Sequence, residues 1–321
     1  VVNEDGAAAS DFRVESDSNT HMLFVDAGDD NVTLGVNNIY KNWYDATNTY
    51  EPLFQQTGSS FALAAQSQVY QNGANTEGPI KYFGKSRSAA GAVGYTAVAD
   101  GDILGIVSFQ GADGTHFMEG ASIRSLVDGT PGVNDVPTNL QFFTNEGTSG
   151  ASKRWTIETD GNLTPANTAY GIHLGVTTPT ASNLLDDYEE GTFTMGMADS
   201  SGNALTMNGT YAVMHYTKIG NLVHINGLPV VSSIASAGAD VRITGLPFTA
   251  NTHATNYSTL AVGYAGSLSI PDDTIISAYV NQSSTIAPMR IWTNTAGTDQ
   301  LSASQLSDGG EFVISGSYIA T

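Results

Sequence analysis

Four acidic side chains lie close together in the sequence and could carry out hydrolysis. They are Asp186, Asp187, Glu189 and Glu190. Two carboxyl groups about 5–10 Å apart can serve as the acid and the base or nucleophile that cleave a glycosidic bond. The acid of such a pair needs a raised pKa, which requires burial. We expect these side chains to be solvated or paired with Lys218 or Arg242, so we predict no catalytic residue and no enzyme.

Metal ligands are the second chemistry to consider. One segment is rich in oxygen ligands, namely Asp26, Asp29, Asp30 and Asn31. Carboxylate and amide oxygens suit Ca²⁺, but the spacing differs from that of an EF-hand loop and no bidentate Glu closes the segment. We interpret it as a surface turn. The chain has no cysteine, which excludes thiolate metal sites and disulfide bonds.

The histidines are scattered along the chain. They are His21, His116, His173, His215, His224 and His253. His215 and His224 could face each other across a hairpin, but we expect each histidine to be packed or exposed rather than a ligand. No glycine-rich phosphate loop precedes a helix, and no GxSxG nucleophile motif is present. The sequence therefore predicts no metal and no cofactor.

Four aromatic residues in the C-terminal part are candidates for contact with a ligand. They are Tyr257, Tyr264, Tyr279 and Trp292. Exposed rings stack on sugar faces and supply a large contact area at low entropy cost. Because an alternating strand turns about half of its residues inward, we expect one or two of these rings at a binding surface.

The charge balance limits the partners. The chain has 11 basic and 31 acidic residues, a net charge of −20, and only 13% charged residues, about half the usual share of roughly 25%. Nucleic acid requires clustered basic residues, and an anionic membrane surface would repel this chain. A neutral glycan or a protein remains compatible. Lys81, Lys85 and Arg87 form a basic cluster, which we expect to pair with acids across a subunit interface.

The pattern of short apolar stretches predicts an all-β chain. Residues 101–114, 121–123 and 140–144 are apolar runs separated by turns that contain Gly and Asp, and none of them has helical periodicity. Residues 184–321 contain about eight such runs spaced 10–20 residues apart, typical of an antiparallel β-sandwich or jelly roll.

We divide the chain into four predicted regions. They are a shaft-like β module at 1–36, an intermediate β region at 37–95, a β-ladder module at 96–178 and a C-terminal β-sandwich at 184–321. Residues 61–70 could form a short helix or a pair of strands. No apolar run is long enough to span a bilayer, and we predict no membrane insertion. The sequence begins at Val1 rather than Met, and we expect a missing or N-terminal portion to attach it to other proteins.

Three stretches resemble the tail-fibre and other virion-fibre proteins of tailed bacteriophages. The first is Phe-Gly-Lys-Ser-Arg at 83–87 with the run from Gly-Asp-Ile-Leu-Gly at 101–105 to Pro-Gly at 131–132. The second is Arg-Trp-Thr-Ile-Glu-Thr-Asp-Gly-Asn at 154–162. The third is Leu-Asp-Asp-Tyr-Glu-Glu-Gly-Thr-Phe at 185–193, with Tyr-Thr-Lys-Ile-Gly-Asn at 216–221 and Thr-Gly-Leu-Pro-Phe at 244–248.

The resemblance implies an elongated homotrimer in the virion, displayed outward on the tail or another appendage. A shaft of short strands would lead to a C-terminal head that binds a glycan or protein of the host cell surface during adsorption. Other virion proteins would hold the opposite end. We further expect each chain alone to have too narrow a core, so that burial between chains supplies the missing interior.

Three alternatives remain at this point. A tailspike that degrades host polysaccharide would be an enzyme and would use carboxylates such as Asp187 and Glu190. A capsid or neck fibre would be purely structural, without a receptor role. A bacterial surface adhesin would need an export or anchor signal, and the sequence shows neither.

Overall fold

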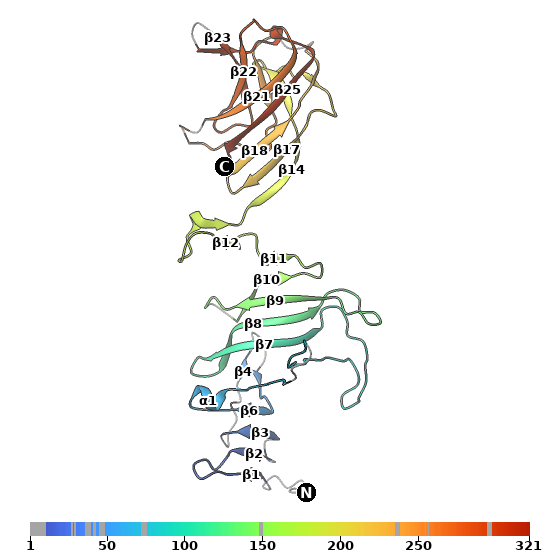
Figure 1. Cartoon of the computed structure of the whole chain (residues 1–321), viewed down its shortest axis with the longest axis vertical. Coiled ribbons are helices and arrows are strands. Elements are labelled where there is room, and N and C mark those ends of the chain that lie inside the picture. Colours follow the sequence, from blue (N-terminus) through green and yellow to red (C-terminus); the bar gives the residue numbers. More distant parts are fainter. Residues whose placement is uncertain are drawn as a thin grey trace. The chain divides into compact units, whose positions relative to one another are not determined.

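The computed structural model separates into two compact units, unit 1 at residues 1–170 and unit 2 at residues 171–321 (Figure 1). It describes residues 11–26, 28, 30–35, 40, 43–44, 49–71, 76–147, 150–234, 238–253, 255, 257–293 and 297–321. Within these residues, regular structure is almost entirely β-strand, with the one-turn helix α1 (Phe61–Ala64) and two short 3₁₀ turns. The all-β prediction is therefore confirmed.

Unit 1 begins with a small sheet of four short strands. The strands are β1 (Phe12–Val14), β2 (Leu23–Asp26), β3 (Asn31–Leu34) and β6 (Phe54–Gln56). They lie in the order β1-β2-β3-β6, and β3 and β6 are parallel. The helix considered for residues 61–70 is limited to α1, because Ala65 is already extended and so short a helix gains little from its own hydrogen bonds.

The second sheet of unit 1 contains the predicted ladder. Its strands are β4 (Trp43–Tyr44), β5 (Thr49–Tyr50), β7 (Ile103–Ala112), β8 (Phe117–Val127), β9 (Thr138–Thr144), β10 (Ser152–Ile157) and β11 (Leu163–Pro165). The order is β11-β10-β9-β8-β4-β5, and β7 also pairs with β8. Figure 1 shows β7, β8 and β9 of this sheet as neighbouring cyan and green strands. Strands β7, β8 and β9 lie within residues 96–178, where the sequence predicts a β-ladder module.

In this sheet the apolar side chains lie on the more exposed face and polar side chains are buried on the other, the reverse of an ordinary domain. Registered pairs place one apolar row across β7, β8, β9 and β10, formed by Val107, Ile123, Phe142 and Trp155. We call it the apolar row. All four of its side chains are partly or largely exposed. The opposite face buries polar side chains, namely Ser122, Gln141 and Thr156. The sheet therefore exposes its apolar row to solvent in the single chain.

Unit 1 consequently has almost no apolar core of its own. Among its described residues, only Phe24 and Val127 are buried hydrophobic side chains. Many large apolar side chains are exposed instead, including Phe83 and Phe109. A contiguous exposed apolar surface of this kind is typical of an interface.

Unit 2 is built on one continuous antiparallel sheet. Its elements up to β19 are β12 (Ile172–His173), η1 (Ala181–Asn183), β13 (Leu184–Leu185), β14 (Tyr188–Thr194), β15 (Gly196–Asp199), β16 (Thr206–Met207), β17 (Val213–Ile219), β18 (Leu222–Gly227) and β19 (Val231–Ser233). The remaining elements are β20 (Val241–Thr244), β21 (Ser258–Leu268), β22 (Ile275–Val280), β23 (Ala287–Thr293), β24 (Gly297–Gln300), η2 (Ala303–Gln305) and β25 (Leu306–Ile319).

The strand order of unit 2 nearly closes the sheet on itself. The order is β14-β17-β18-β25-β21-β22-β23-β20-β15, and β24 pairs with β23. Its two end strands, β14 and β15, are separated in the chain by the single buried residue Met195. The sheet must therefore curve until its ends meet, and its inner face encloses the core.

This core belongs to unit 2 alone. Fully buried side chains include Phe312, Met214 and Leu260, and strict alternation places Val223 and Ile225 inside with His224 outside. The expectation that each chain has too narrow a core is therefore wrong for unit 2. The period-two pattern of its strands supplies enough inward apolar residues for a closed interior.

The buried carboxylate of Asp199, at the end of β15, accepts hydrogen bonds from residues 201, 203 and 238. This fully buried carboxylate accepts hydrogen bonds from the Asn203 side chain at 2.9 Å and from the backbone N–H groups of Gly238, Asn203 and Ser201 at 3.1, 2.9 and 2.9 Å. These bonds favour the charged form and hold the pKa of Asp199 well below its usual range.

We expect Asp199→Asn to lower the melting temperature of unit 2 at pH 7. Because the folded-state pKa is depressed, the stability that this group contributes is complete above its unfolded pKa of about 3.9 and is lost as the pH falls toward the folded value. The variant should therefore lose less stability than the parent protein between pH 6 and pH 3. Calorimetry at both pH values checks this, with the exposed Asp299→Asn as control; equal melting temperatures for D199N and the parent at pH 7 would refute it.

Candidate functional site

The outer face of unit 2 carries a continuous row of mostly polar side chains, which we call the polar row. Register pairs connect them strand by strand from β17 to β23, in the order His215, Asn226, Ser315, Ala261, Ser277 and Arg290. All six are exposed or half-buried, whereas their neighbours along each strand point into the core. The row is uncharged apart from Arg290, whose Nη2 donates to the Thr298 carbonyl oxygen at 2.8 Å.

Three of the four predicted aromatic residues lie at this face. Tyr257 directly precedes β21 and Tyr279 lies on β22, with ring centroids 6.1 Å apart and planes inclined by 55°. Trp292 on β23 donates its indole N–H to the Ser277 hydroxyl at 3.0 Å. Tyr257 and Trp292 are 55% and 51% exposed. We call Tyr257, Tyr279, Trp292 and Ser277 the aromatic face.

Tyr264 lies on β21, but its side chain contacts Glu311 rather than the aromatic face. A bulge in β21 separates Val262 from Tyr264 in the pairing with β25. The Tyr264 hydroxyl donates to Glu311 Oε1 at 2.9 Å, and this bond raises the pKa of Tyr264. The ring is half exposed. The structure therefore brings Tyr257, Tyr279 and Trp292 to one face and places Tyr264 beside an acid on β25.

His224 is a polar residue of the outer face that the sequence indicated only as a possible partner of His215. Its Nδ1 lies 3.0 Å from the Ser317 hydroxyl and its Nε2 lies 3.5 Å from the Ser315 hydroxyl. His215 and His224 lie on the same face of the β17–β18 hairpin but not opposite each other, because the register pairs His215 with Asn226 and His224 with Thr217. Alternation along β18 could have placed His224 outward, but its serine partners are 93 and 91 residues away in sequence.

The acidic cluster is largely occupied by local partners. Asp187 forms an ion pair with Lys218, as expected from the sequence. Glu189 accepts a hydrogen bond from the Tyr216 hydroxyl, and Glu190 accepts one from the Tyr188 hydroxyl at 3.1 Å. Glu189 and Glu190 are consecutive on β14 and point to opposite faces.

The segment considered for Ca²⁺ is a turn where the structure describes it. Asp26 Oδ1 accepts a hydrogen bond from the Gly28 N–H at 2.8 Å, and Asp29 lies outside the described residues. Within the described part of the chain, no group of three or more His, Asp or Glu residues is placed to hold a metal ion. No helix in that part has the length and apolarity needed to cross a membrane.

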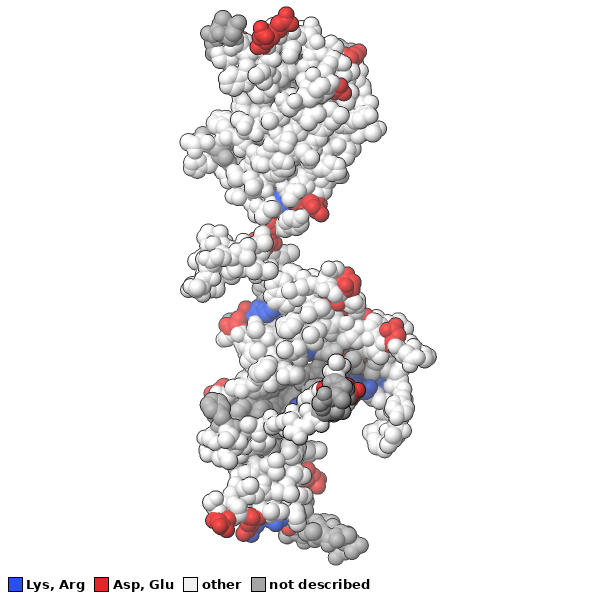
Figure 2. Space-filling model, viewed as in Figure 1, with Lys and Arg blue, Asp and Glu red and all other residues white. Residues whose placement is uncertain are grey.

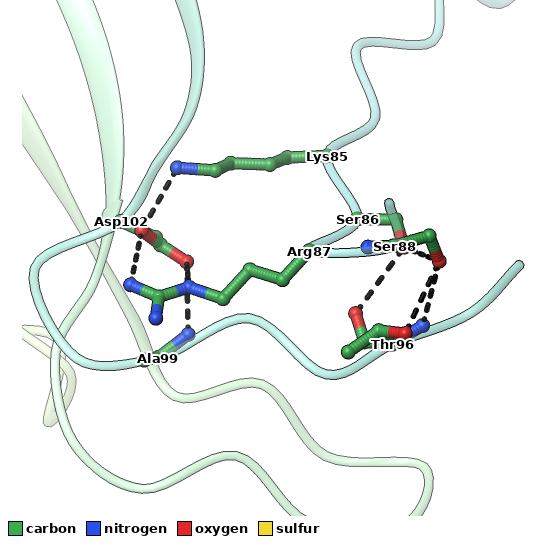
Figure 3. A network of polar contacts seen from close by, with 7 residues as sticks. All are labelled: Lys85, Ser86, Arg87, Ser88, Thr96, Ala99 and Asp102. Atoms are coloured by element: carbon green, nitrogen blue, oxygen red, sulfur yellow. Dashed lines mark hydrogen bonds and ion pairs between the residues drawn. The ribbon is translucent and has the colours of Figure 1, made fainter. Parts of the chain in front are cut away.

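The basic cluster pairs within the chain rather than across an interface. The Lys85 ammonium group lies 2.8 Å from Asp102 Oδ1, and Arg87 donates to both carboxylate oxygens of Asp102, at 2.7 and 2.9 Å (Figure 3). The Ala99 N–H also donates to Asp102 at 2.9 Å. These bonds hold the pKa of Asp102 well below its usual range. The expected interface role is wrong for Lys85 and Arg87, because a buried carboxylate nearby already requires both cations.

Charged groups are sparse over the visible surface (Figure 2). Acidic groups are scattered there and basic groups are few, in agreement with the composition. The aromatic face itself consists of neutral side chains. Its contacts with a ligand would therefore rest on ring stacking and hydrogen bonds rather than on charge.

Comparison with known proteins gives limited similarity. No protein-family model matches the chain, and no curated protein matches it. Among solved structures, the chain is similar to the Dettilon tailspike protein (gp208), with a TM-score of 0.34 and 18% identity over 41% of this chain. The match spans 24% of that tailspike chain. This neighbour is consistent with a phage tail protein, and similarity at this level carries no argument beyond that.

The prediction that the chain is not an enzyme is corrected here. One solved structure that matches the chain is that of a tailspike protein, and a tailspike is the enzymatic alternative that the sequence left open. The exclusion of activity is therefore withdrawn. Receptor binding and glycan cleavage are both tested below.

Proposed function

We propose that this chain belongs to an outward-facing tail appendage of a tailed bacteriophage and binds a host-surface glycan through the aromatic face of unit 2. The observation that carries the proposal is the gathering of Tyr257, Tyr279 and Trp292 beside a row of small polar side chains on one outer face. Aromatic rings pack on the apolar faces of sugars, and hydroxyl and amide groups bind their hydroxyl groups.

A neutral glycan fits this surface better than an anionic one. The chain carries a net charge of −20, so a polyanionic capsule would be repelled over most of the surface. The polar row offers Ser, Asn and His side chains, which can both donate and accept hydrogen bonds. A host protein receptor is the other class of ligand, and the binding experiment below includes it.

Three copies of the chain would assemble through unit 1 in this proposal. The apolar row on β7–β10 and the near absence of buried hydrophobic side chains in unit 1 support an interface between copies. Unit 2, with its own core, would remain free to display the aromatic face. Three linked weak sites bind a cell surface far more tightly than one, because later contacts form at high effective concentration.

We expect Tyr257→Ala combined with Trp292→Ala to reduce binding to host cells by at least about tenfold per site, since buried aromatic anchors commonly contribute more than 1.4 kcal/mol. The matched control is Tyr211→Ala, which removes an exposed tyrosine of unit 2 outside the aromatic face. Flow cytometry of fluorescently labelled protein on host cells, with and without prior periodate or protease treatment of the cells, measures the effect and separates glycan from protein receptors. Equal binding by the double variant and the control would refute the proposal.

The same samples test glycan cleavage. The parent protein is assayed for release of reducing sugar from host polysaccharide. If it releases sugar and Asp187→Asn or Glu190→Gln abolishes the release, the main function is depolymerase activity rather than receptor binding. Thermal melting of each variant must accompany the assay, because Asp187 pairs with Lys218. An intact parent protein that neither binds host cells nor blocks infection would favour a purely structural fibre.

A further inference from the structure

A loop of unit 1 presents two large apolar side chains that touch nothing in their own unit. Val93 and Tyr95 are fully exposed, and they lie in the irregular segment between Arg87 and β7. We call residues 88–96 the small-residue loop, because alanine, glycine and serine make up most of it. Solvated side chains of this size at a loop tip gain nothing within the chain.

The base of this loop is held firmly. The Arg87 N–H donates to the Thr96 carbonyl oxygen at 3.1 Å, and the Ser88 hydroxyl lies 3.2 Å from that of Thr96 and 2.8 Å from that of Ser86. Arg87 itself is fixed to Asp102 at the start of β7. Figure 3 shows the hydroxyl cluster and the ion pairs side by side. The loop therefore projects Val93 and Tyr95 from an ordered base.

The same unit contains an apolar groove that its own loop does not fill. The groove has a volume of about 380 Å³ and is lined by Tyr82, Phe83, Gly105, Val107, Ile123 and Leu140, among others. It includes two members of the apolar row. Phe83 packs over Gly105, where a Cβ atom would lie 2.7 Å from that of Phe83. The glycine thus allows the chain segment that borders the groove to pass close to the sheet.

We propose that Val93 and Tyr95 of one copy insert into the groove of a neighbouring copy, a specific contact that rests on the homotrimer in the proposed function. We assign a second copy as the occupant because its small-residue loop carries the exposed apolar side chains Val93 and Tyr95. Chains with a net charge of −20 repel one another, so their contacts must join neutral surfaces. Residues 88–99 contain no charged side chain, and the groove adds only Lys81. The hydrogen-bonded base of the loop reduces the entropy that is lost on docking.

Cross-linking tests the contact directly, because the chain has no cysteine of its own. The test variant combines Val93→Cys in the loop with Ser125→Cys in the groove, and a second variant combines Tyr95→Cys with Ser125→Cys. The matched control combines Val133→Cys, an equally exposed valine of unit 1, with Ser125→Cys. Each protein is treated with a short bis-maleimide and run on a denaturing gel, after its mass in solution has been measured by sedimentation.

Covalent dimers and trimers in either test variant, and not in the control or in the single Val93→Cys protein, are the expected result. Trimeric protein that yields no covalent oligomer in both test variants would overturn the insertion and leave the proposed assembly standing. A monomeric parent protein would instead refute the assembly itself. As a second measurement, Val93→Ser with Tyr95→Ser should lower the temperature at which the trimer dissociates, whereas Val133→Ser should leave it unchanged.

Discussion

Replacing Val107 by aspartate should convert the assembled protein into monomers. Val107 is 44% exposed in the single chain, so in a monomer the substitution would change stability by no more than about 0.5 kcal/mol. At an interface between copies, the same side chain would bury an unpaired carboxylate, which costs several kcal/mol for each copy. Because these two costs differ so much, the variant tests whether the apolar row is buried against another copy of the chain.

Sedimentation equilibrium of Val107→Asp beside Val133→Asp measures the outcome. Val133 is almost fully exposed in unit 1 and does not belong to the apolar row, so its aspartate should leave the parent's mass unchanged. Circular dichroism should show that unit 2 remains folded in both proteins. If Val107→Asp sediments as a trimer, the apolar row is not covered by sister chains.

Replacing Phe312 by alanine should produce the largest loss of stability in unit 2. Phe312 on β25 is fully buried within the core. Truncation of a buried phenylalanine costs about 3–5 kcal/mol in the free energy of unfolding, which corresponds to roughly 6–20 °C in melting temperature for a unit of this size. Scanning calorimetry should show this shift in the unit 2 transition.

Val313→Ala is the matched control for this experiment. Val313 follows Phe312 on the same strand, but its side chain points outward and is substantially exposed. The alanine variant should shift the melting temperature by only a small fraction of the Phe312→Ala effect. Similar shifts for the two variants would mean that β25 does not present alternate faces to the core and the solvent.

The strands of unit 2 were accessible from sequence because their alternation is regular. Along residues 223–226, apolar and polar residues alternate, and β18 turns Val223 and Ile225 inward. The candidate aromatic residues could be named by residue type alone, whereas the outward positions of Tyr279 and Trp292 are seen only in the strands of the structure. Local pattern determines which side of a strand a residue takes, and this is information that a single sequence contains.

Pairings between distant segments could not be predicted from the sequence. The long contact between β21 and β25 joins residues about 50 positions apart, and it determines that Tyr264 meets Glu311. The basic cluster was assigned to the wrong partner because nothing in residues 81–87 indicates that Asp102 is buried nearby. Likewise, the closure of the sheet through Met195 depends on the register of nine strands and not on any local signal.

During translation, the residues of the unit 1 sheet are synthesised before those of unit 2. At 5–20 residues per second, the 151 residues from 171 to 321 require roughly 8–30 s of further translation. Throughout that interval, Val107, Ile123 and their registered neighbours would face water on a nascent polypeptide. Chains growing on adjacent ribosomes of one message are the nearest molecules able to shield them, so the yield of native protein should rise with polysome density and with chaperone supply.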